Sequence, residues 1–124
     1  MTKQEAFDKA VRGLASQNWE LSMRQGPDRG SSFCAYRGIG GRRCAIGWLI
    51  PDNEYHAGME GEAVVSRALQ AVPSLKPSPV EGLDWIDFIL QLQLAHDDAR
   101  SPHELQELLH ALATEHDLTW PEGC

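Results

Sequence analysis

The stretch that decides the fold is residues 33–46, which read FCAYRGIGGRRCAI. Two short runs, 33–37 and 42–46, flank a glycine-rich connector at 38–41. Glycine tolerates the positive φ angles that tight hairpin turns need. The spacing therefore predicts a β-hairpin, in which Cys34 and Cys44 lie on neighbouring positions of the two strands.

The segment before this hairpin is predicted to be a helix over about residues 3–16. Thr2 and Glu5 fit a capping box, in which each side chain accepts a hydrogen bond from a backbone N–H of the other. Apolar residues then recur at helical spacing and form one stripe. The stripe consists of Ala6, Phe7, Ala10, Val11 and Leu14.

The chain after the hairpin is predicted to be mainly helical. A short helix is expected at residues 63–69, and three prolines within 73–79 predict a loop. The stretch from Asp84 to about His96 has apolar residues nearly all round a helix, which predicts the most buried element. Ser101 and Pro102 give the start signals of a last helix. Together these segments predict an α+β fold in one domain spanning residues 1–124, with an N-terminal helix, a small antiparallel β-hairpin or sheet, and two or three packed C-terminal helices.

Charge is unevenly distributed along the 124 residues, whose net charge is −7. Residues 81–124 carry one basic side chain, Arg100, and ten acidic ones, a net charge of −9. Such a surface disfavours non-specific binding to nucleic acid or anionic lipid and suits a basic protein partner. No apolar run is long enough to span a bilayer and no signal peptide is recognisable, so we expect a cytoplasmic protein with reduced cysteines and no membrane association.

A sequence pattern in the middle of the chain resembles small proteins encoded by phages and prophages. It runs as C-x-Y-R-G from Cys34, then as G-x-x-C-A-I-G-x-L-I-P-D-x-x-Y from Gly41 to Tyr55, followed by E-G at Glu60. The segment L-Q-x-x-H-D at 92–97 is similar to theirs as well. The likeness covers about half of the chain, mostly residues 34–64. It implies a phage-derived accessory factor that acts on a host protein, a candidate inhibitor of host defence, and it implies no particular activity.

The cysteines and histidines allow two chemical alternatives. Cys34 and Cys44 on one hairpin would offer two ligands for zinc, but no C-x-x-C or H-x-x-x-H spacing accompanies them. A cysteine-dependent enzyme would use Cys44 or Cys34 with His96, and Asp97 or Asp98 would orient the histidine. Nothing in the sequence places these residues together, so we expect small buried thiols, with no metal, cofactor or catalytic residue.

The arginines near the connector suggest a third alternative, nucleic-acid or phosphate binding. Arg37, Arg42 and Arg43 surround the glycines, and a basic β-ribbon can enter a groove of DNA. The glycines match neither a P-loop nor a dinucleotide fingerprint, and the net charge opposes nucleic acid as a partner.

The sequence therefore predicts a small non-enzymatic binding module that docks on a host protein. Loops rich in glycine and charge are common binding elements, which favours the connector and the segment 52–62 as the docking surface. The predicted partner-binding residues are Arg37, Ile39, Arg42, Arg43, Asp52, Tyr55 and Glu60. The acidic helices are the alternative surface, and the oligomeric state stays open.

Overall fold

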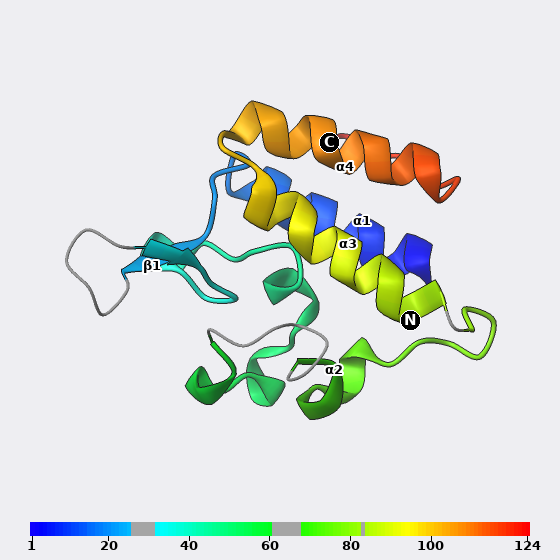
Figure 1. Ribbon diagram of the computed structural model, residues 1–124, viewed down its shortest axis with the longest axis horizontal. Coiled ribbons are helices and arrows are strands. Elements are labelled where there is room, and N and C mark those ends of the chain that lie inside the picture. The colour runs from blue at the N-terminus through cyan, green and yellow to red at the C-terminus, as the bar shows by residue number, and fades with distance from the viewer. Residues whose placement is uncertain (26–31, 61–67, 83) are drawn as a thin grey trace.

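The computed structural model describes residues 1–25, 32–60, 68–82 and 84–124, and these residues are mostly helical (Figure 1). The α-helices are α1 (Lys3–Ser16), α2 (Ala68–Ala71), α3 (Asp84–Asp98) and α4 (Pro102–Glu115). Two three-residue strands, β1 (Met23–Gln25) and β2 (Ser32–Cys34), form the only sheet in this part of the chain. The α+β prediction is therefore wrong, because strands contribute only this short ladder. Most of the predicted helix at 63–69 lies outside the described residues.

Helix α1 forms as the sequence predicts. The Thr2 hydroxyl accepts a hydrogen bond from the Glu5 N–H at 3.1 Å, and the Glu5 carboxylate accepts one from the Thr2 N–H at 2.9 Å. This capping box satisfies two backbone donors that have no partner within the helix. The predicted apolar stripe of α1 is fully buried.

Helices α3 and α4 lie side by side, joined by a short connection at 99–101 (Figure 1). Ser101 caps α4 by accepting a hydrogen bond from the Glu104 N–H at 3.1 Å, and Pro102 is the first helical residue. The Glu104 carboxylate accepts from the Arg100 N–H at 3.3 Å and not from the Ser101 N–H, so only one half of a capping box is formed. The start of α4 is otherwise as predicted.

Helix α3 is buried on one side only. Its inner face carries Trp85, Phe88, Ile89 and Leu92, all buried. Its outer face leaves three large apolar side chains in solvent, Ile86, Leu90 and Leu94. The prediction that α3 is buried all round is therefore correct for its inner residues and wrong for these three.

The predicted hairpin between 33–37 and 42–46 is absent from the structure. Strand β2 pairs with the upstream strand β1 instead, so Cys34 lies opposite Met23 and not beside Cys44. The connector forms a 3₁₀ turn at Ile39–Gly41, with positive φ at Gly40 (74°) and Gly41 (76°). The glycines thus adopt the predicted backbone angles, but they link two irregular segments and not two strands.

After the connector, a turn at residues 45–46 leads into a 3₁₀ helix that packs against α1. Cys44, Ala45 and Ile46 are consecutive and fully buried, whereas a strand with one solvated face buries every second residue. The 3₁₀ turn Gly47–Leu49 follows them. It brings the Trp48 ring so close to Gly13 of α1 that a Cβ on Gly13 would lie 2.2 Å from it. The missing side chain at Gly13 therefore makes this packing possible.

The first and last segments of the chain are held together. The Gln4 side chain donates to the Thr119 carbonyl at 2.9 Å and accepts from the Thr119 N–H at 3.0 Å. The next residue, Trp120, stacks on Trp19 and on His110, with ring centroids 5.9 Å and 3.6 Å away.

In the described part of the chain no helix is long and apolar enough to cross a membrane.

Candidate functional site

The connector forms a closed loop whose tip faces solvent. The Gly38 N–H donates to the Arg42 carbonyl at 2.8 Å, which closes the loop across the 3₁₀ turn. Ile39 at the tip is 67% exposed, which is unusual for an isoleucine, and Gly40, Gly41 and Arg42 are exposed as well. The tip therefore offers an apolar and a cationic side chain to the surroundings.

Ser22 supports this loop from the interior. Its hydroxyl lies 2.7 Å from the Ala35 carbonyl oxygen and 3.1 Å from that of Arg42, and its single proton can be donated to either. A Cβ on Gly38 would lie 2.4 Å from the Ser22 hydroxyl and 2.8 Å from the Met23 nitrogen. Only glycine fits at position 38 without displacing the backbone on which the loop rests.

The Glu60 carboxylate fixes the start of the loop. Its oxygens accept hydrogen bonds from the Tyr36 N–H at 2.9 Å, the Arg37 N–H at 3.0 Å and the Tyr55 hydroxyl at 2.7 Å. Arg24 lies 3.7 Å away and supplies the opposite charge, and the Glu60 side chain is only 6% exposed. A carboxylate this buried is stable because donors surround it, so Glu60 is a structural anchor.

The arginines at the ends of the loop are also bound internally. Arg37 donates to Asp52 at 2.6 Å and to the Ile50 carbonyl at 2.8 Å, and its guanidinium lies over the Tyr55 ring. Arg43 approaches the same Asp52 oxygen at 3.3 Å. The hydrogen bond and positive charge of Arg37, with Arg43 second, lower the pKa of Asp52 below its usual value.

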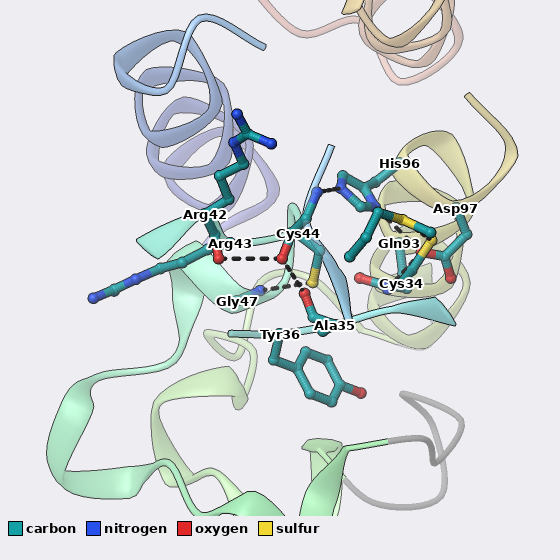
Figure 2. A network of polar contacts seen from close by, with 12 residues as sticks. Cys34, Ala35, Tyr36, Arg42, Arg43, Cys44, Gly47, Gln93, His96 and Asp97 are labelled. Atoms are coloured by element: carbon teal, nitrogen blue, oxygen red, sulfur yellow. Dashed lines mark hydrogen bonds and ion pairs between the residues drawn. The ribbon is translucent and has the colours of Figure 1, made fainter. Parts of the chain in front are cut away.

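The structure therefore divides the seven predicted partner-binding residues into two groups. Five of them bind one another: Arg37, Arg43, Asp52, Tyr55 and Glu60. The remaining two, Ile39 and Arg42, face solvent at the tip. In Figure 2 the side chains of Arg42 and Arg43 point away from the polar network, which the Arg42 carbonyl joins. The seven residues stay predicted partner-binding residues, and among them Ile39, Arg42 and Asp52 are the ones exposed to solvent.

A second cluster brings Cys34, His96 and Asp97 together (Figure 2). Their potential ligand atoms all lie within 4.8 Å of one another. His96 is fully buried, and its Nε2 accepts the Ser22 N–H at 3.0 Å, so Nδ1 carries the proton and faces Asp97 at 3.3 Å. A metal at Nδ1 would leave no proton on either ring nitrogen unless the Ser22 bond were lost. The hydrogen bonding of His96 therefore disfavours a metal in this cluster.

The thiols in this region are also poor nucleophiles. Burial, and then the negative charge of Asp97, raise the pKa of Cys34 to about 12. Burial raises the pKa of Cys44 to about 12 as well. Because the thiolate is the form that attacks carbon, the cysteine-enzyme alternative starts from an unfavourable ionisation state. The structure does place Cys34 beside His96, but without the lowered pKa that catalysis needs.

The sequence analysis missed several residues that build the site. Ser22, Arg24 and Gln17 act through contacts with segments far along the chain, and no local motif marks them. The exposed apolar residues of α3 could have been found from the sequence, because a helix with apolar residues all round carries more of them than one buried face needs.

No protein-family model, curated protein or solved structure matches the chain.

Proposed function

We propose that this protein is a non-enzymatic binding module that docks on another protein through the loop tip, residues 39–42. The observation that carries the proposal is the contrast between an exposed Ile39 and the rigid support beneath it. Glu60 and Ser22 bond from the interior to backbone groups at the two ends of the loop, while Ile39 at the tip is 67% exposed. A loop already held in one shape loses little conformational entropy on binding, which favours affinity.

The side chains at the tip suit a protein surface. Ile39 can fill an apolar pocket, and the Arg42 guanidinium can pair with a carboxylate beside that pocket. Arg42 has no hydrogen-bonded side-chain partner within the described residues, so its donors are available. The likeness to phage and prophage proteins supports a host protein as the partner, with inhibition as the result of docking.

The test combines capture with affinity measurement. Partners are recovered from a bacterial lysate with the intact chain, and the dissociation constant of each purified partner is measured. The double variant Ile39→Asp/Arg42→Glu should weaken binding at least tenfold, since a central contact of this kind contributes about 2 kcal/mol. Val80→Asp is the matched control, because Val80 is an 82% exposed apolar residue outside the loop. If every partner binds the tip variant as well as the original chain, the proposal fails.

The cysteine-enzyme alternative is tested separately by thiol labelling at pH 8. A pKa raised from 9.0 to about 12 lowers the thiolate fraction of Cys34 and Cys44 roughly a thousandfold, so both should label slowly. Cys124 is exposed and should label at the rate of a free cysteine. Fast labelling of Cys34 in the folded protein would favour the enzyme. Near-stoichiometric zinc in the purified protein would favour the metal alternative.

A further inference from the structure

Three large apolar side chains form a stripe on the outer face of α3. Ile86 is 50% exposed, Leu90 36% and Leu94 43%. They are spaced four residues apart, so they lie one above the other on a single face and span about 12 Å of the helix. Each exposed apolar side chain has a cost in water, and three in a row are typical of a surface that another molecule covers.

The stripe continues into hollows at both ends. Near its C-terminal end a groove of about 250 Å³ lies between α3 and α4, lined by Leu94, Ala95, Leu108 and Ala111. Near its N-terminal end Ile86 borders an apolar pocket of about 420 Å³, together with Leu75, Pro77 and Trp85. Because Leu94 of the stripe lines the groove and Ile86 lines the pocket, groove, stripe and pocket form one elongated surface. Its shape suits a rod-like ligand better than a compact one.

The charges beside the stripe and in the groove are negative, whereas Lys76 lines the pocket at the N-terminal end. Asp98 and Glu115 line the groove, and Asp87 is exposed beside the stripe. Neither Asp87 nor Asp98 forms an ion pair within the described residues, so both charges remain unneutralised. The whole of residues 81–124 supplies only Arg100 as a basic side chain against ten acidic ones.

We propose that the outer face of α3 and its groove with α4 bind a basic amphipathic helix of another protein. Such a helix places apolar side chains at intervals of three and four residues against the stripe, and its lysines and arginines against the carboxylates. A second copy of this face would bring like charges together, and the same charges repel anionic lipid and nucleic acid. Charge complementarity therefore selects this occupant. The proposal rests on the protein-binding function above but uses different residues.

The probe is a fluorescein-labelled 14-residue peptide of leucine and lysine with the leucines at helical spacing. Fluorescence anisotropy of this peptide with the intact chain should show saturable binding that weakens as salt is raised. A scrambled peptide of the same composition has no apolar stripe and should bind at least tenfold more weakly. A leucine–glutamate peptide of the original spacing should not bind.

Two variants locate the binding surface. Ile86→Ser/Leu94→Ser removes apolar contacts at exposed positions, and Asp87→Lys/Asp98→Lys reverses the rim charges without altering the stripe. Each should weaken peptide binding at least tenfold, with circular dichroism showing that the helices remain. Val80→Ser is the matched control and should bind the peptide as the original chain does. In nuclear magnetic resonance spectra of the intact chain, the peptide should shift amide signals of α3 and α4.

Three outcomes overturn the proposal. The first is equal binding of the regular and scrambled peptides, which would mean non-specific attraction. The second is unchanged binding by both variants. The third is a dimer in light scattering that Ile86→Ser/Leu94→Ser converts to monomer, because a second copy would then cover the face. The loop-tip variant Ile39→Asp/Arg42→Glu should leave peptide binding unchanged, so failure here and failure of the tip as a docking site are distinguishable.

Discussion

Two regions of the molecule are stabilised in different ways. In α1, α3 and α4 the backbone groups bond within each helix, and burial of one apolar face holds the helices together. In the segment 35–60, side chains from distant positions satisfy many of the backbone groups. Gln17, for example, accepts from the Arg43 N–H at 2.9 Å and donates to the Arg43 carbonyl at 2.8 Å. The helical region thus depends on many small apolar contributions, whereas the loop region depends on a few polar side chains.

The largest effect is expected in the helical core. Phe88 on α3 is fully buried and contacts the rings of Trp85 and His116. Phe88→Ala should lower the free energy of unfolding by about 4 kcal/mol, because it removes apolar contacts and leaves a cavity. Urea denaturation measures this change. Ile86→Ala on the outer face of the same helix is the control and should cost less than about 1 kcal/mol.

A single carboxylate in the loop region should have nearly as large an effect. Glu60→Ala leaves two backbone N–H groups and the Tyr55 hydroxyl without their acceptor, and should cost about 3 kcal/mol. Glu107→Ala removes an exposed carboxylate from α4 and should change stability by less than about 0.5 kcal/mol. Equal effects of the two substitutions would contradict the claim that polar anchors hold the loop.

The third-largest effect on stability is expected from a substitution at Gly38, because its backbone lies close to Ser22 and Met23. Gly38→Ala forces the loop away from the Ser22 hydroxyl and the Met23 backbone and should cost about 2 kcal/mol. Gly58→Ala is the matched change, because its Cβ would have no neighbour nearer than 3.4 Å. Thermal unfolding of the two variants should differ clearly. A Gly38→Ala protein as stable as the Gly58→Ala protein would show that the loop can move without cost.

Ser101 is the N-cap of α4, so substituting it tests how much this one polar side chain contributes to the stability of the protein. Ser101→Ala removes the acceptor of the Glu104 N–H and should cost about 1 kcal/mol. Ser101→Gly should cost only about 0.3 kcal/mol, since glycine allows water to reach the free donor. Urea denaturation of both variants gives the comparison, and a larger loss with glycine would argue against capping.

The smallest effect is a pH dependence that Asp52 contributes. Its pKa in the folded protein lies below the usual value of 3.8, because Arg37 and Arg43 favour the charged form. The contribution of Asp52 is therefore present above about pH 3.8 and is lost as the pH falls through the lower, folded-state pKa. Asp52→Asn should reduce the slope of unfolding free energy against pH below pH 4. An unchanged slope would show that Asp52 and its arginines do not stabilise the folded state.

The same contrast between local and distant contacts explains how much of the structure can be predicted from the sequence. Thr2, Glu5, Ser101 and Pro102 act on backbone groups within one helical turn, so their positions alone predict where α1 and α4 begin. The side chains of Ser22, Gln17 and Glu60 each bond to backbone groups that lie 13 to 26 residues away. Nothing in a local window distinguishes them from ordinary surface residues. The glycines at 40 and 41 predict positive φ correctly, but they do not specify whether strands or irregular segments follow.

The position of the site was predictable only in part. Exposure of a glycine-rich, charged loop follows from its composition, and Ile39 and Arg42 are exposed as expected. Partner contact by Arg37, Asp52 and Glu60 stays a prediction; what the sequence did not show is that Arg37 bonds to both carboxylates within the chain. The sequence shows how many charged side chains the protein has, but which of them form pairs depends on the fold.

The hydrogen bonds between Gln4 and Thr119 have a consequence for chain order. They hold residue 4 against residue 119, so a linker that joins these two segments would allow the chain to be opened elsewhere as a circular permutation. If such a protein, opened at the exposed residue Asn53, keeps the same helices, covalent continuity through the loop region is not required for folding. The arrangement of the segments in space, and not their succession, then defines this protein.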